Sequence, residues 1–147
     1  MKGMTIGLRA TRTRAFTAED RLAYRWLAHD NGNDRENGRY RIPEPLIAGM
    51  FSCILGTDLP GFGANYLKQR MEFIQPAYFG EALTASVTVV RLRPDKNLVN
   101  LETLCHNAKG ELICRGEALV LAKDVQERQR QDDAERDEHT DRYLQSC

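Results

Sequence analysis

The sequence predicts an α+β fold in which an antiparallel sheet covers one strongly apolar helix. Residues 45–56 are apolar at nearly every position, which is typical of a helix that is buried on all sides. Residues 64–122 then form several short runs in which apolar and polar side chains alternate, with turn-forming sequences between them. Because a helix and a one-sided sheet can bury their apolar surfaces against each other, we expect a single domain over residues 1–122.

The composition of the whole chain is that of a globular protein without a charge bias. Of its 147 residues, 41% are hydrophobic, and 21 basic side chains balance 21 acidic ones. This balance argues against a dedicated nucleic-acid binder and against a protein that binds anionic membranes. Residues 45–59 are the longest mostly apolar stretch and are too short to span a bilayer, and the N-terminus lacks the apolar core of a signal peptide. We therefore expect a soluble, cytoplasmic protein.

The N-terminal part of the chain predicts a strand and then a helix. Residues 5–16 contain several arginines, as is typical of an edge strand whose charges deter aggregation. Thr17 is a plausible N-cap, Asp20 takes the place of Glu or Gln in a capping box, and Phe16 is at the staple position. The helix is expected to end near His29. Its apolar face consists of Leu22, Trp26 and Leu27.

The central part predicts a long polar loop and then the apolar helix. Residues 30–44 are turn-formers and charged residues, and loops of this length are usually functional or mobile. Pro45 suits the first turn of the helix, and Gly56 is a natural end. The strands that follow are expected in residues 64–75, 82–92, 98–106 and 111–122.

The last 25 residues differ from the rest of the chain. Residues 123–147 contain five basic and eight acidic side chains and almost no apolar stripe, so they cannot form a core helix. We expect a charged tail or an exposed helix supported by acid–base pairs four residues apart. A helix that docks on a partner subunit is the alternative.

The four cysteines do not predict a metal site. Cys53, Cys105, Cys114 and Cys147 form no CxxC pair and have no histidine cluster nearby, so we expect reduced thiols and no metal.

Several segments together resemble a known family, the MaoC-like (R)-specific enoyl-CoA hydratases and 3-hydroxyacyl thioester dehydratases. The resemblance covers about residues 14–122. It includes a helix end with small residues, a Leu-Pro-Gly turn, a strand that ends in an aromatic-x-x-Pro segment, and a Gly-Glu step into the next strand. These features lie in Phe51–Leu67, Met71–Pro76, Gly80–Ala85 and Arg115–Ala118.

The resemblance implies the hot-dog fold, a sheet wrapped around one long central helix, and a dimer whose sheets join edge to edge. It also implies a tunnel for a thioester-linked acyl chain. Hydration of an enoyl thioester needs a base to activate water and an acid to protonate the α-carbon, and it also needs donors for the negative charge that develops on the thioester oxygen. In the family, an Asp and a His five residues later form the acid–base pair, and a His-Gly-Met segment begins the central helix.

This chain departs from the family pattern at both places. The family aspartate falls on Asp30, but Arg35 stands where the histidine is expected, and arginine is a poor proton shuttle. The His-Gly-Met segment falls on Pro43, Glu44 and Pro45. The two prolines have no N–H to donate, and Glu44 adds a carboxylate beside the expected oxyanion site.

The candidate residues each have a simpler interpretation. We expect Asp30 to be the catalytic base, although it could merely end the preceding helix. His29 could replace the missing imidazole, but adjacent side chains usually point apart. We expect the Glu44 N–H to bind the oxyanion, and Ser52 and Gly49 to line the substrate site. Ser52 could instead bond back to the helix main chain.

The resemblance therefore leaves three functions open. The first is a hydro-lyase of fatty acid or polyketide metabolism that acts on acyl thioesters of coenzyme A or acyl carrier protein, without another cofactor. The second is a catalytically silent subunit that binds acyl thioesters or acts as a scaffold. The third is a hot-dog thioesterase. As partners we expect a homodimer or higher oligomer, or a hetero-oligomer with a related hot-dog subunit, and neither nucleic acid nor membrane.

Overall fold

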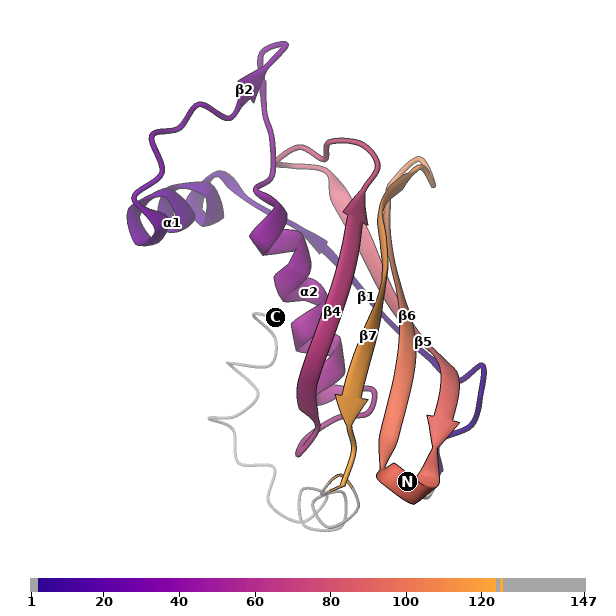
Figure 1. Ribbon diagram of the computed structural model, residues 1–147. Helices are drawn as coiled ribbons and strands as arrows, with labels where there is room; N and C mark the ends of the chain where they lie inside the picture. Colours follow the sequence, from indigo (N-terminus) through magenta and orange to yellow (C-terminus); the bar gives the residue numbers. More distant parts are fainter. Residues whose placement is uncertain (1–2, 124, 126–147) are drawn as a thin grey trace, which may run out of the picture.

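A curved antiparallel sheet packs against one side of a central helix, α2 (Figure 1). The computed structural model describes residues 3–123 and residue 125. The α+β class predicted from the sequence is confirmed. The elements in chain order are β1 (Arg9–Ala15), α1 (Ala18–Ala28), β2 (Arg35–Glu36), β3 (Arg39–Tyr40), α2 (Glu44–Thr57), β4 (Asn65–Phe73), β5 (Ala82–Arg93), the short 3₁₀ turn η1 (Pro94–Lys96), β6 (Leu98–Asn107) and β7 (Leu112–Leu121).

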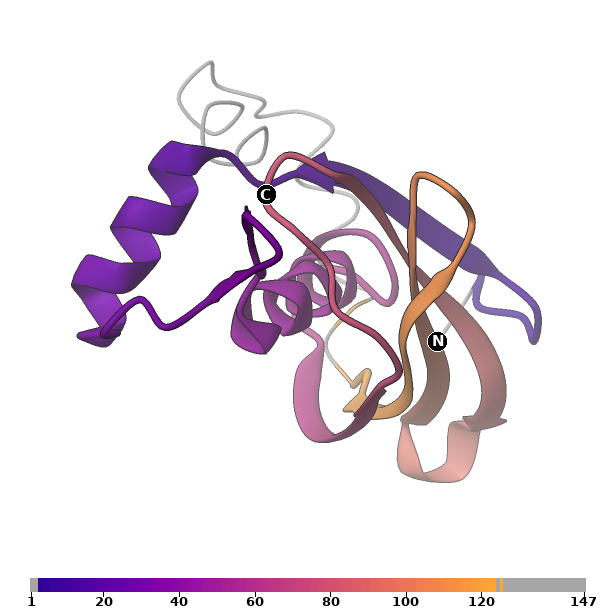
Figure 2. The same cartoon turned by 90° about the horizontal axis from the view of Figure 1, so that it is seen from above.

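The five long strands form one sheet in the order β1-β5-β6-β7-β4, and all neighbouring strands are antiparallel. β1 and β4 are the edges of this sheet, so the edge strand expected in residues 5–16 is confirmed. Seen from above, α2 lies between the concave side of the sheet and α1 (Figure 2). This arrangement places both ends of α2 beside strand ends of the sheet.

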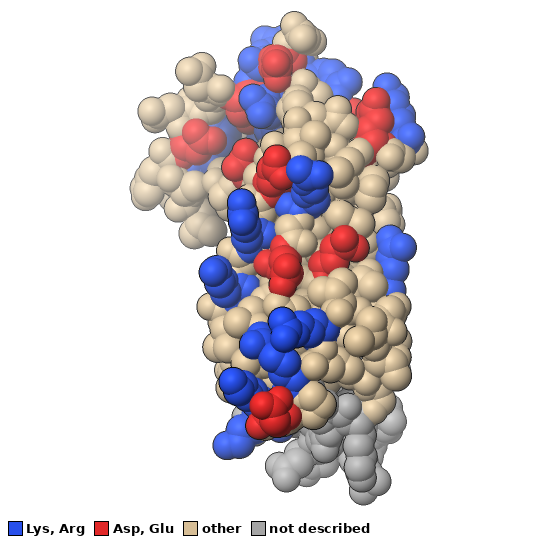
Figure 3. Space-filling view, turned by 45° about the vertical axis from the view of Figure 1, so that its right-hand side comes forward, with Lys and Arg blue, Asp and Glu red and all other residues tan. Residues whose placement is uncertain are grey.

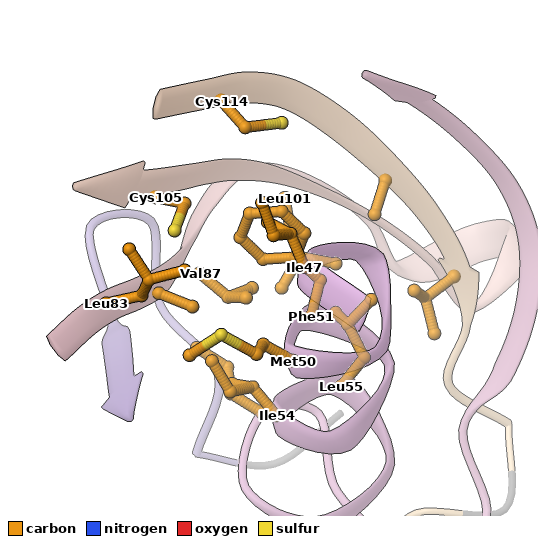
Figure 4. Close-up of a cluster of buried hydrophobic side chains, with 14 of the residues drawn as sticks. Ile47, Met50, Phe51, Ile54, Leu55, Leu83, Val87, Leu101, Cys105 and Cys114 are labelled. Atoms are coloured by element: carbon orange, nitrogen blue, oxygen red, sulfur yellow. The ribbon is translucent and has the colours of Figure 1, made fainter. Parts of the chain in front are cut away.

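The core lies between α2 and the sheet. Phe51 and Ile54 of α2 are completely buried, as are Leu83 and Val87 of β5 and Leu101 of β6. Figure 4 shows these α2 side chains pointing toward the strands. The apolar helix and the alternating strands therefore bury each other as the sequence predicts.

The opposite side of α2 is not buried, so the expectation of a helix covered all round is wrong for a single chain. Pro45, Gly49 and Ser52 are exposed along that side. The sheet contacts only one face of α2, and the exposed positions recur at helical spacing. An open stripe of small side chains therefore runs along the central helix.

The N-terminal helix α1 has the predicted cap but buries none of its residues. The Thr17 N–H donates to Asp20 Oδ2 at 2.8 Å, and the Asp20 N–H donates to Thr17 Oγ1 at 3.2 Å, which is a complete capping box. The apolar face predicted from the helical spacing is exposed to solvent. Its exposed fractions are 60% for Leu22, 86% for Trp26 and 81% for Leu27.

The region expected to be one long loop contains a small hairpin, β2–β3. Arg35 pairs with Tyr40 and Glu36 with Arg39. Asn37 and Gly38 make the turn with φ angles of 49° and 77°, the positive values that an Asn-Gly hairpin turn requires.

The expectations for the cysteines, the charged tail and a membrane span have different outcomes. Cys105 and Cys114 are free and buried, but Cys53 is disulfide-bonded, so the expectation of reduced thiols is wrong for that residue. The charged tail expected from residue 123 onward lies outside the described residues, except for Lys123 and Val125. In the part of the chain that the structure describes, no helix is long and apolar enough to cross a bilayer.

Candidate functional site

A small cavity opens at the N-terminus of α2. Its volume is about 160 Å³. The segment that enters α2 forms one wall and residues 73–77 form the other, and the Ile42 N–H joins them by donating to the Ala77 carbonyl at 2.8 Å. The lining residues are Arg41, Ile42, Glu44, Ile47, Phe73, Ile74, Gln75, Pro76 and Ala77.

The first turn of α2, beside this cavity, has one free backbone donor among residues 44–46. Pro45 has no N–H, and the Leu46 N–H donates to the Pro43 carbonyl at 3.0 Å. The Glu44 N–H donates to no acceptor among the described residues, as is usual for the first position of a helix. The partial positive charge of a helix N-terminus makes this donor suitable for an oxygen that gains negative charge.

The Glu44 side chain is also free. Its carboxylate forms no hydrogen bond or ion pair with any described residue, and it is the only carboxylate among the residues that line the cavity. Its charge reaches the buried thiol of Cys114, whose pKa is raised to about 11 by burial and, to a smaller extent, by Glu44. Such a thiol is protonated at neutral pH, so Cys114 is not a nucleophile for this cavity.

A second cavity, also about 160 Å³, lies further along α2 on its open side. Ser52 lines it, two turns after Glu44, and its hydroxyl has no hydrogen-bond partner among the described residues. The alternative interpretation, a bond from Ser52 back to the helix main chain, is therefore wrong. Gly49 lies between Glu44 and Ser52, and a Cβ added there would meet no atom within 4 Å. The lining of this second cavity consists of Ser52, Leu55, Gly56, Ala64, Tyr66 and Val120.

Tyr66 is held in the wall of the second cavity by a chain of polar contacts. Its hydroxyl donates to Gln69 Oε1, and Gln69 Nε2 donates to Thr103 Oγ1 at 3.1 Å and to the Arg70 carbonyl at 2.9 Å. Thr103 is completely buried, so the chain is anchored in the core. Burial raises the pKa of Tyr66, which keeps its phenol neutral.

The predicted acid–base residues lie elsewhere, at the C-terminal end of α1. His29 is exposed and forms the helix C-cap in the left-handed region. Asp30 Oδ1 accepts the Gly32 N–H at 3.2 Å, which is a local turn contact. Neither residue lines the cavity at Glu44, and both ribbon views show this end of α1 well apart from α2. Within one chain, the structure does not bring Asp30 or His29 to Glu44, and their catalytic roles stay predictions.

The position expected for the family histidine is occupied by an exposed arginine on the hairpin. Arg35 lies over the Tyr40 ring, with its guanidinium carbon 5.8 Å from the ring centre. Sequence reasoning missed the ion pair that holds the neighbouring segment, between Arg21 of α1 and Asp34. These two residues are thirteen positions apart and no local pattern signals their contact.

The outer face of the sheet carries charges of both signs. On the face shown in Figure 3, basic and acidic side chains are interspersed. Arg115 pairs with Glu72 at 2.8 Å, and Arg70 lies across from Glu117 in the β4–β7 pairing. A depression of about 260 Å³ over β4, β6 and β7 includes Lys68, Arg70 and Asn100. Among the described residues, no three His, Cys, Asp or Glu side chains cluster in a way that could hold a metal ion.

No family model matches the chain, but known proteins with similar sequences were found. The (R)-specific enoyl-CoA hydratase of Rhodospirillum rubrum is 45% identical over 76 residues, which are 52% of this chain and 52% of that protein. The matched part is also only about half of the enzyme of the same name from Aeromonas caviae. The mitochondrial 3-hydroxyacyl-[acyl-carrier-protein] dehydratase FERN of Solanum lycopersicum is 30% identical over 129 residues, 80% of this chain and 77% of that one.

Solved structures of similar fold belong to related proteins. An (R)-hydratase from A. caviae involved in PHA biosynthesis superposes with a TM-score of 0.76 at 31% identity, covering 82% of this chain and 98% of that one. The ChsH1–ChsH2 complex from Mycobacterium tuberculosis matches in fold, with a TM-score of 0.69 at 12% identity over 81% of this chain and 98% of that chain.

Proposed function

Because this chain belongs to the MaoC-like family of (R)-specific enoyl-CoA hydratases and 3-hydroxyacyl thioester dehydratases, which have the hot-dog fold, we propose that it hydrates enoyl thioesters and catalyses the reverse dehydration. The observation that carries the proposal is the cavity at the N-terminus of α2, with the Glu44 N–H unpaired at its edge. A thioester carbonyl that accepts this N–H would receive the helix dipole where enolate charge develops.

The acyl chain is then proposed to follow the open side of α2. Gly49 offers no side chain to block the path, and the second cavity at Ser52 lies on the same side of the helix. This cavity is small and Tyr66 closes part of it, so we propose a short-chain acyl substrate. Ser52 and Gly49 would border the substrate, as the resemblance implied.

The carrier of the acyl group is proposed to be coenzyme A or an acyl carrier protein, both of which carry phosphate. Arg41 lines the cavity at Glu44 and is exposed, and among the described residues it forms one ion pair, a long one of 3.7 Å to Glu36. It is therefore available to a phosphate at the mouth of the cavity.

As a partner we propose a second copy of the chain, joined along the β4 edge. β4 has a partner strand on one side only, and Tyr66 and Leu67 on it are 43% and 53% exposed. An unpaired strand edge with exposed apolar side chains favours pairing with another chain. A related hot-dog subunit at the same edge is the alternative, because the ChsH1–ChsH2 structure with the same fold is a complex.

The test is turnover of crotonyl-CoA by the purified full-length chain. We expect loss of the enoyl absorbance with formation of 3-hydroxybutyryl-CoA and no release of free thiol. Saturable binding of butyryl-CoA without any turnover would overturn hydration in favour of a silent acyl-binding subunit. Release of free coenzyme A without hydration would instead identify a thioesterase.

A further inference from the structure

We propose that the Glu44 carboxylate is the group that moves the proton in this site, in place of an aspartate–histidine pair. The assignment rests on the proposed function and deepens it. Sequence reasoning gave Glu44 only a backbone role, with a carboxylate that would oppose the enolate unless it is protonated or turned away. The structure gives three observations that change this view.

The first observation is position. Glu44 is the first residue of α2 and lines the cavity that would receive the thioester. The α-carbon of a thioester is bonded directly to the carbonyl carbon. A carbonyl oxygen held by the Glu44 N–H therefore brings the α-carbon next to the same residue.

The second observation is that the Glu44 carboxylate has no bonding partner among the described residues. Most carboxylates near the hairpin are engaged: Glu36 contacts Arg41 and accepts the Tyr78 hydroxyl, and Glu81 pairs with Arg39 at 2.6 Å. Asp34 is held by Arg21. Glu44 has no such partner among the described residues, and its flexible side chain can turn into the cavity.

The third observation is that no other side chain among the described residues that line the cavity can accept a proton. The other polar side chains there are Arg41 and Gln75. Arginine stays protonated and the Gln75 amide does not titrate, so neither can accept a proton from carbon or water. Gln75 Nε2 is also occupied, because it donates to the Leu112 carbonyl at 3.1 Å.

A single carboxyl group is sufficient for the reaction. In hydration, the oxygen of water bonds to C3 while its proton passes to the Glu44 carboxylate, and the C2–C3 double-bond electrons move to the thioester oxygen as an enolate. The neutral carboxyl group then returns that proton to C2, the enolate collapses to the thioester, and the carboxylate is restored. Glu44 is neutral while the enolate exists, so the two charges never oppose each other. Addition by one group places H and OH on the same face.

The test compares Glu44→Gln with Glu44→Asp, Asp30→Asn and the control Glu19→Gln, an exposed carboxylate of α1 without a partner among the described residues. General acid–base groups contribute about 10²–10⁴-fold, so we expect Glu44→Gln to lower kcat for crotonyl-CoA by that factor. Glu44→Asp should keep part of the rate. In D₂O, the wild type should exchange the C2 proton of butyryl-CoA, and Glu44→Gln should not, while both bind this ligand equally.

Each other outcome overturns a specific statement. An active Glu44→Gln beside an inactive Asp30→Asn would return the role to Asp30. A fall in butyryl-CoA affinity that matches the loss of kcat would make Glu44 a binding residue only. A wild type that neither hydrates nor exchanges would refute the proposed function itself, which separates that failure from an error about Glu44.

Discussion

Arg21 and Asp34 form a bidentate ion pair, in which Arg21 Nε and Nη2 each donate to one Asp34 oxygen at 2.8 Å. The two side chains are only 12% and 11% exposed. The Arg21 guanidinium carbon also lies 3.7 Å from the centre of the Tyr40 ring. One arginine of α1 therefore holds both the segment that follows the helix and the second strand of the hairpin.

We expect Asp34→Asn to loosen this segment and to lower the free energy of unfolding by about 1 kcal/mol, the upper range for ion pairs near the surface. Chemical denaturation with urea at neutral pH measures the change. Asp95→Asn is the matched control, because Asp95 is exposed and has no partner among the described residues. Equal stabilities for the wild type and Asp34→Asn would show that the pair contributes nothing.

The same pair predicts an acid-dependent loss of stability. The hydrogen bond from Arg21 lowers the pKa of Asp34 in the folded chain below the unfolded value of about 3.9. The contribution is therefore complete above the unfolded pKa and disappears as the pH falls through the folded pKa. Asp34→Asn should flatten this part of the stability–pH curve, and a curve parallel to that of the wild type would contradict the assignment.

Gly116 of β7 is required by the close approach of β4. A Cβ built on Gly116 would overlap the Arg70 carbonyl oxygen and come within 3.1 Å of Gln69 Nε2. Because the obstacle is backbone, Gly116→Ala should destabilise the fold by about 1–3 kcal/mol. Gly56→Ala is the control, since a Cβ there meets nothing within 4 Å and an alanine favours the helix by about 1 kcal/mol. Urea midpoints that move in the same direction for both variants would refute this contrast.

Local and periodic signals predicted much of the fold. The Thr17–Asp20 capping box and the apolar core of α2 follow from short-range sequence rules, and both are present. The Asn37–Gly38 turn has a strong hairpin signal too, but the flanking strands have only two residues each and are too short for alternation to show.

The candidate site was harder to predict, because it depends on contacts between distant segments. The resemblance placed the oxyanion donor at Glu44, and the structure leaves that N–H free. The resemblance also led us to expect Asp30 beside it, and the position of α1, which no local rule fixes, separates them. The freedom of the Glu44 carboxylate could not be read from the sequence, since it depends on which partners other side chains take.

Two aromatic residues test how α1 and α2 differ in burial. Phe51 of α2 is completely buried and Trp26 of α1 is 86% exposed. We expect Phe51→Ala to cost about 3–5 kcal/mol by leaving a cavity, and Trp26→Ala to change the free energy of unfolding by less than about 0.5 kcal/mol. Both are measured by urea denaturation at a low protein concentration. A large cost for Trp26→Ala that grows with protein concentration would show that another molecule covers α1.

Gly49 separates the stability of α2 from its use as a substrate path. The space beside Gly49 is open, so Gly49→Ala should stabilise the helix by about 1 kcal/mol in the absence of ligand. The added methyl group would also narrow the open side of α2 between Glu44 and Ser52. We therefore expect weaker binding of butyryl-CoA by the same, more stable variant, measured by calorimetric titration beside thermal unfolding. Higher stability with unchanged affinity would remove Gly49 from the path of the acyl chain.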